Sequence, residues 1–283
     1  MTKMGFIQKA ITFLTRKQVF FETKNFKFIY YGLIISLAGF VGFLLGVLSL
    51  QSFQIYTKNF VMALIILSAL FVCIFSEKIT FNKWFTYFGA FVGFMLALIL
   101  LSFFYSVPLL ILCDSLFIIL PFMQAFGRLA SINNGCCSSN YGVYKNKIVP
   151  VHAYEIFFNL ILGGFMILLL FYNPYMGVVS SVYLLGYGGI RLFIEPYRNE
   201  EKKIFLGKYS LYQMLLTFSF WILGVLYLSF SLIYKIPINV LFRWEYLLNA
   251  FYFIPLIFIM SLVVFFTFGV YKKKGENHGT KAY

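Results

Sequence analysis

A polar, glycine-rich stretch lies in the middle of an otherwise apolar chain and holds the residues best suited to chemistry. It runs from Gln124 to Gly142 as QAFGRLASINNGCCSSNYG and contains no acidic residue. Arg128 and Asn134 in this stretch can donate several hydrogen bonds to an anion such as a phosphate group. We therefore predict that the stretch binds an anion or takes part directly in a reaction.

Acidic side chains within apolar segments mark further candidate sites. Asp114, Glu155 and Glu195 lie inside or at the ends of such segments, and His152 and Tyr154 are close to Glu155. A charge placed in hydrocarbon is costly and is usually kept for a function. Asp114 could alternatively be a buried structural acceptor that caps a neighbouring backbone.

Four residues occur at intervals of three or four positions, the spacing of residues on one face of a helix. Tyr187, Arg191 and Glu195 are each four residues apart, and Arg198 follows one turn further along. A helix would place the first three on the same side. Arg191 and Glu195 could form an ordinary ion pair at a helix end, or Arg191 could clamp phosphate oxygens by paired donors.

Metal binding and cysteine chemistry are less favoured. His152 has no partner at metal-ligand spacing, and the chain contains only two histidines and no CxxC pair. Cys136 and Cys137 could be redox-active or nucleophilic, but no activating base is evident, so we prefer a structural role. Cys73 and Cys113 lie in apolar runs, where cysteine usually acts as a small hydrophobe. We expect no metal ion and no cofactor.

The segments that position these residues are predicted to be membrane helices. The chain is 61% hydrophobic and 22% aromatic with only 11% charged residues, which lies outside the range of soluble globular proteins. Several apolar runs reach the roughly 20 residues needed to cross a bilayer. Eight spans are expected, at 28–50, 60–76, 84–105, 107–122, 152–172, 175–195, 211–234 and 246–270.

The expected fold is therefore an all-α integral membrane protein. It is a polytopic bundle of seven to eight transmembrane helices, because only Ser106 and Pro108 separate the third span from the fourth. A polar, partly membrane-embedded loop, 123–151, is expected between the fourth and fifth helices. Glycines in the first span, at positions 32, 39, 42 and 46, would let another helix or a lipid come close, although plain helix packing explains them equally.

Four regions follow from this pattern. Residues 1–27 form a basic, amphipathic, interfacial segment, for which a signal peptide is the alternative, although no small-residue cleavage site follows a short apolar core. Residues 28–234 form the main transmembrane domain. Residues 235–270 contain a further C-terminal transmembrane segment, and residues 271–283 form a basic tail.

The net charge of +14 indicates contact with lipid and not with nucleic acid. The basic residues lie in tails and loops between apolar runs instead of on one amphipathic face. In a membrane protein such residues orient the chain and contact anionic headgroups. By the positive-inside rule, the loop that contains Arg128 would face the cytoplasm.

Several motifs occur together in an order and spacing that resembles the prolipoprotein diacylglyceryl transferase family. The resemblance covers about residues 30–234 and includes a GCC variant of the signature at Gly135 to Cys137. The matching motifs are Tyr31-Gly32, FGAFVG at 88–93, Asp114, the signature from Gly127 to Gly142, Pro150 with Tyr154-Glu155, the helix bearing Tyr187, Arg191, Glu195 and Arg198, and Ser210 with Gln213.

The resemblance implies an activity and a location. A diacylglyceryl group would pass from phosphatidylglycerol to the lipobox cysteine thiol of a prolipoprotein, with release of glycerol phosphate, as the first step of lipoprotein maturation. The partners would be phosphatidylglycerol and prolipoprotein signal peptides, with no cofactor, and the protein would be a multi-pass component of the bacterial cell membrane. The nucleophile would belong to the substrate, which fits the lack of a Ser-His-Asp set here.

The resemblance also implies roles for individual residues. Arg128 and Arg191 would bind the phosphate, Glu155 or Glu195 would act as a base, and Glu195 could instead hold Arg191. The implied catalytic residues are Arg128, Arg191, Glu195, Glu155 and Tyr187. The implied substrate-binding residues are Tyr31, Asn134, Gly135, Gly142, Tyr154, Arg198 and Gln124.

Departures from the family pattern keep other hypotheses open. Phe88 stands where the family often has a histidine or tyrosine, and Ser131 and Cys136 replace an asparagine and a glutamate of the signature. They favour, as one alternative, a paralogous transferase with a different acceptor. A transporter or lipid-binding scaffold is a third hypothesis, although no internal repeat supports it. The family is expected to work on the outer face, against the charge count, so orientation stays open.

Overall fold

The fold is a bundle of apolar helices. A computed structural model describes residues 18–23, 25–55, 57–78, 87–134, 142–144, 147–149, 151–172, 174–197, 205–206, 209–241 and 243–272. Within these ranges, five helices are long and apolar enough to cross a membrane, and up to seven spans result if each of two bent helix pairs counts as one. The predicted all-α polytopic class is confirmed.

The described helices and strands have the following bounds. The helices are α2 (Tyr30–Ser52), α3 (Lys58–Lys78), α4 (Tyr87–Tyr105), α5 (Leu109–Phe117), α6 (Leu120–Asn134), α7 (Val151–Leu170), α8 (Val178–Ile194), α9 (Leu211–Tyr234), α10 (Glu245–Phe251) and α11 (Ile254–Gly269), with a short 3-10 helix η1 (Glu195–Tyr197) after α8. The strands are β1 (Val19–Glu22), β2 (Phe26–Ile29), β3 (Gly142–Tyr144), β4 (Lys147–Val149), β5 (Phe205–Leu206), β6 (Tyr209–Ser210) and β7 (Val270–Lys272).

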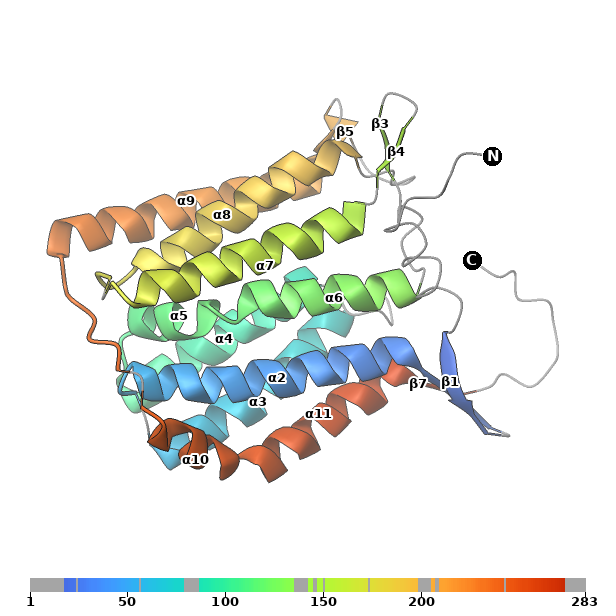
Figure 1. Cartoon of the computed structure of the whole chain (residues 1–283), viewed down its shortest axis with the longest axis horizontal. Helices are drawn as coiled ribbons and strands as arrows, with labels where there is room; N and C mark the ends of the chain where they lie inside the picture. Colours follow the sequence, from blue (N-terminus) through green and yellow to red (C-terminus); the bar gives the residue numbers. More distant parts are fainter. Residues whose placement is uncertain are drawn as a thin grey trace.

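Neighbouring helices lie side by side across the bundle. In Figure 1, α9, α8, α7, α6, α2 and α11 follow one another, with α3 and α4 behind them, and each consecutive pair in this series is in contact. The strands lie at one end, where β3 and β6 both contact η1. This end contains the first turn of α7 and the last turns of α6 and α8, so the polar segments predicted from the sequence meet there.

Each helix buries a stripe of its surface and leaves apolar side chains on the outside. On α7 the buried side is spaced by three or four residues and includes His152, Glu155 and Asn159. Phe157, Phe165 and other large apolar side chains on the opposite side are exposed. Exposed apolar surface of this extent is expected for helices that contact lipid.

Two predicted boundaries were wrong, and a third segment lies mostly outside the described residues. The expected fourth span, 107–122, is two helices, α5 and α6, bent by 47° between residues 117 and 120. Residues 124–134, expected in a loop, continue the membrane helix α6. Of the segment 1–27, residues 19–22 and 26–27 belong to the strands β1 and β2, whereas residues 1–17 lie outside the described residues. The polar side chains of Gln124 and Arg128 meet partners inside the bundle, and a helix satisfies its backbone hydrogen bonds there.

Asp114 joins α5 to the start of α8. Its carboxylate accepts hydrogen bonds from the backbone N–H of Gly177 at 2.5 Å and of Ser180 at 2.8 Å, and from the Ser180 hydroxyl at 2.7 Å. An anion at a helix N-terminus satisfies donors that the helix itself cannot satisfy. Gly177 has a φ of 94°, a conformation that glycine adopts most readily. The expected role of Asp114 as a buried acceptor is confirmed.

The C-terminal span packs against the first helix of the bundle. α10 and α11 are bent by 54° relative to each other, and α11 lies along α2. A Cβ atom on Gly32 would overlap the backbone of Gly269, so these two glycines set the close approach of the helices. β7, which follows α11, pairs with β2, which precedes α2.

Candidate active site

Three adjacent helices each contribute one charged residue to a buried cluster. Arg128 comes from the middle of α6, Glu155 from the start of α7, and Arg191 from the end of α8. The helices are neighbours in the order α6, α7, α8, so Glu155 lies on the central helix. Charged residues from three separate segments of the sequence are thereby brought together.

The Glu155 carboxylate bridges the two arginines. Its Oε2 atom lies 2.6 Å from Nε of Arg128, and its Oε1 atom lies 2.5 Å from Nη1 of Arg191. The Glu155 side chain is only 2% exposed. A buried carboxylate is stable only when it is paired and hydrogen-bonded. Both of its oxygens are therefore committed to guanidinium groups.

The predicted polar face of α8 is present. Glu195 Oε2 lies 3.7 Å from Nη2 of Arg191, and Tyr187, Arg191 and Glu195 are all buried. The Tyr187 ring stacks on that of Tyr183, with 5.9 Å between ring centroids. Gln124 of α6 donates its Nε2 hydrogen to the Tyr183 hydroxyl at 2.8 Å. Gln124 thus supports the face of α8 that carries Arg191.

Arg128 and Arg191 form their ion pairs through different nitrogens of the guanidinium group. The side chain of Arg128 is 19% exposed, and among the described residues its ion pair with Glu155 occupies only the Nε side. Arg191 is 4% exposed and contacts two carboxylates through Nη1 and Nη2. The two Nη groups of Arg128 are therefore the donors that an incoming anion could reach.

His152 belongs to this cluster, although sequence reasoning considered it only as a metal ligand. Its Nδ1 atom lies 3.4 Å from Glu155 Oε2, one helical turn away, and its ring is fully buried. The spacing of three residues between His152 and Glu155 on a helix was the available signal. No group of three His, Cys, Asp or Glu side chains that could hold a metal ion occurs in the described part of the chain.

Other predicted site residues lie elsewhere or outside the described residues. Tyr31 is buried in a separate apolar cluster with Ala130 and Phe268. Tyr154 is exposed on α7, whereas its neighbour Glu155 is buried. Asn134 is the last residue of α6 and Gly142 the first of β3. Gly135, Cys136, Cys137 and Arg198 lie outside the described residues.

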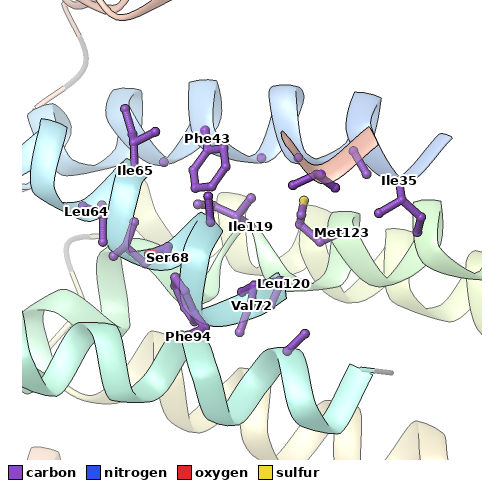
Figure 2. A pocket seen from close by; sticks show the side chains of 18 of the residues that line it. Ile35, Phe43, Leu64, Ile65, Ser68, Val72, Phe94, Ile119, Leu120 and Met123 are labelled. Carbon is purple, nitrogen blue, oxygen red and sulfur yellow. The ribbon is translucent and has the colours of Figure 1, made fainter. Parts of the chain in front are cut away.

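An apolar cavity of about 140 Å³ lies among α2, α3, α4 and the α5–α6 pair. Figure 2 shows Phe43, Ile119 and Met123 at its wall, and no lining residue carries a charge. The cavity follows the glycines of α2 and reaches Gly127, the residue before Arg128. A Cβ atom on Gly39 would meet no other atom within 4 Å, so this glycine borders open space.

The comparisons with known proteins agree with this arrangement. A model of the prolipoprotein diacylglyceryl transferase family matches residues 18–230, a range that contains the whole charged cluster and ends before α10. The chain is also 29% identical, over 132 residues, to the phosphatidylglycerol–prolipoprotein diacylglyceryl transferase of Chlorobaculum tepidum. That alignment spans 41% of this chain and 44% of the relative. Because the family model matches most of its length, the chain belongs to the prolipoprotein diacylglyceryl transferase family.

Proposed function

We propose that this protein transfers the diacylglyceryl group of phosphatidylglycerol to the thiol of a lipobox cysteine in a prolipoprotein. A thioether forms and glycerol phosphate leaves. The observation that carries the proposal is the Arg128–Glu155–Arg191 cluster, together with an apolar cavity that reaches Gly127, the residue before Arg128. The family membership and the name of the Chlorobaculum relative support it.

Arg128 is the residue best placed to bind the phosphate of the donor lipid. Its side chain is partly exposed, its Nη groups have no partner among the described residues, and its Nε group is fixed by Glu155. A guanidinium held in this way offers two parallel donors to phosphate oxygens without further ordering. Negative charge builds on the departing phosphate in this reaction, so these donors stabilise the transition state more than the bound lipid.

Arg191 acts mainly by positioning Glu155. It is almost fully buried and its terminal nitrogens face Glu155 and Glu195. Its charge still contributes to the positive potential around the phosphate, because interactions in a site of low dielectric are weakly screened. The two arginines therefore have different main roles, although both belong to one ion-pair network.

The apolar cavity fits the acyl chains of the donor lipid. It begins at Gly127, beside the proposed phosphate-binding residue, and continues between α2, α3, α4 and the α5–α6 pair. A phospholipid has the same arrangement of an anionic group joined to apolar chains. With its phosphate at Arg128, an acyl chain would enter the cavity along Gly39 and Gly42.

The chain is a multi-pass protein of apolar helices, and we place it in the bacterial cell membrane. The substituted signature residues Ser131 and Cys136 leave one alternative function, a paralogous transferase that uses the same donor with another acceptor. Ser131 donates its hydroxyl hydrogen to the Gly127 backbone oxygen at 3.0 Å, within α6. This contact occupies the hydroxyl donor of Ser131 and gives the alternative no further support.

The direct test uses purified full-length protein, phosphatidylglycerol labelled in its acyl chains, and a lipobox peptide with either Cys or Ser at the acceptor position. We expect label on the Cys peptide alone and equimolar release of glycerol phosphate. Arg128→Ala should reduce transfer about 100-fold or more. Arg243→Ala, at an exposed position next to α10, is the matched control and should transfer normally. Consumption of lipid without labelling of the Cys peptide would support the paralogous acceptor, and lipid binding without turnover would exclude an enzyme.

A further inference from the structure

We infer that His152 is the base that takes the proton from the acceptor thiol, an assignment that rests on the proposed transfer reaction. A thiol with an ordinary pKa near 8.5 is a poor nucleophile until it loses its proton. The active site must therefore contain a proton acceptor that is not already occupied. The side chains of the charged cluster that could accept this proton are Glu155, Glu195 and His152.

Glu155 is unsuited to the role of base. Both of its carboxylate oxygens are already paired with guanidinium groups, at 2.6 and 2.5 Å. Protonation of Glu155 would remove the charge that neutralises two arginines in a buried site. Glu195 is likewise buried and paired with Arg191, at 3.7 Å. The acidic residues of the cluster thus hold the arginines in place.

His152 has a nitrogen that is not engaged. Its Nε2 atom is buried and has no hydrogen-bond partner among the described residues, whereas Nδ1 faces Glu155 Oε2 at 3.4 Å. A buried nitrogen without a partner is uncommon in folded proteins and requires an explanation. A reacting group that binds there only during turnover provides one.

Glu155 also selects the tautomer of His152. A carboxylate oxygen accepts, so the ring hydrogen lies on Nδ1, and Nε2 is left with its lone pair. The charged groups around the ring are Arg128 from α6, Glu155 from α7 itself, and Arg191 and Glu195 from α8. Their formal charges cancel when His152 is neutral. A carboxylate that orients an imidazole while the far nitrogen removes a proton is the geometry used to activate nucleophiles in hydrolases.

The reaction balances with this base. The thiol proton moves to His152 Nε2, and the sulfur attacks the glyceryl carbon that carries the phosphate oxygen. A carbon–sulfur bond forms as that carbon–oxygen bond breaks, and the electron pair leaves with glycerol phosphate. One positive charge thus appears on His152 while one negative charge appears on the phosphate bound by Arg128. The proton later passes to the departing phosphate or to water, which restores the neutral imidazole.

The position of His152 suits a peptide acceptor. It is the second residue of α7, at the end of the bundle where the short hairpins β3–β4 and β5–β6 lie (Figure 1). A lipobox cysteine follows the apolar core of a signal peptide and therefore arrives near the membrane surface. Its thiol would approach from this end, and binding of the peptide would have to expose the buried Nε2 atom, while the phosphate of the donor lipid binds Arg128.

The test compares His152→Gln, His152→Ala and His278→Gln in full-length protein. His278, the other histidine of the chain, is the matched control and should transfer at the normal rate. We expect His152→Gln to lower kcat about 100-fold or more with the KM for phosphatidylglycerol unchanged. The dependence of kcat on pH should differ between unmodified protein and His152→Gln. Added imidazole should partly restore His152→Ala.

The possible results distinguish a failure of the His152 assignment from a failure of the proposed function. If unmodified protein transfers label but His152→Gln retains its rate and its pH dependence, His152 is not the base. A changed KM or lower melting temperature with the pH dependence retained would also overturn the inference, because it would show a structural role. If unmodified protein transfers no label to any lipobox peptide, the proposed function itself fails.

Discussion

Arg191 of α8 reaches across to α7 and places its Nη1 atom 2.5 Å from Oε1 of Glu155. This contact joins residues 36 positions apart within a site where neither side chain exceeds 4% exposure. Breaking a buried pair leaves an uncompensated charge, which typically costs about 3–5 kcal/mol. The pair therefore serves both the stability of the bundle and the position of the catalytic groups.

Glu155→Gln should abolish transfer and lower the melting temperature. The substitution leaves Arg128 and Arg191 together without the carboxylate between them, and it removes the acceptor that orients His152. Thermal unfolding in detergent and the labelled-lipid assay measure the two effects. Glu245→Gln, on the exposed surface of α10, is the matched control and should change neither. A fully active Glu155→Gln protein would contradict the proposed cluster.

The two arginines should respond differently to replacement by lysine. Arg191→Lys removes one of two donor groups from a fully buried network and should lower both stability and activity. Arg128→Lys affects a partly exposed side chain and should mainly lower kcat, with little loss of stability. Melting temperatures together with kcat and KM of both variants decide the point. Equal loss of stability in the two would show that their roles are not separate.

Gly39→Leu should block the cavity without disturbing the fold. No atom lies within 4 Å of a Cβ at this position, so the added side chain would extend into the space proposed for an acyl chain. We expect about a tenfold loss of transfer from long-chain phosphatidylglycerol and a smaller loss with a short-chain donor, as one or two lost apolar contacts would produce. Gly164→Leu on α7 is the control, since its Cβ also meets nothing and it does not line the cavity. The same loss in both variants would exclude the acyl-chain assignment.

Asp114→Asn should weaken the junction between α5 and α8. Asparagine retains one carbonyl oxygen, whereas the carboxylate accepts from the Gly177 backbone through one oxygen and from Ser180 through the other. The expected loss is about 1–2 kcal/mol, as for the loss of a helix cap. Activity per folded molecule should change little, because the junction lies at the end of α8 opposite Arg191. An unchanged melting temperature would argue against the capping role.

The sequence predicted those parts of the site that lie on one element. The spacing of Tyr187, Arg191 and Glu195 is a local property of a helix, and all three are buried, the first two on α8 and Glu195 at the start of η1. Pairing between Arg128 and Glu155 depends on the contact and axial register of α6 and α7. No local pattern encodes that register, so the bridging position of Glu155 emerged only from the structure.

Prediction from the sequence was wrong where one residue pattern is compatible with two structures. Polar residues in an apolar chain indicate either a loop or a helix face that lines a site, and residues 124–134 proved to be the second. His152 was judged by metal-ligand spacing alone, although a single carboxylate one turn away is enough to orient an imidazole. Tyr31 stays a predicted substrate-binding residue, and its burial with Phe268 of α11 involves a helix far along the chain, which no local pattern predicts.

The contact between Gly32 and Gly269 has a consequence for the order in which the protein matures. α2 is the first described helix that a ribosome delivers to the membrane, and α11 is the last. Val264 of α11 lines the cavity together with residues of α2, so this part of the wall exists only after nearly the whole chain has been synthesised. Nascent chains that end before α11 leave α2 uncovered on that side. The cavity wall proposed to hold a lipid chain would therefore be complete only once α11 packs against α2.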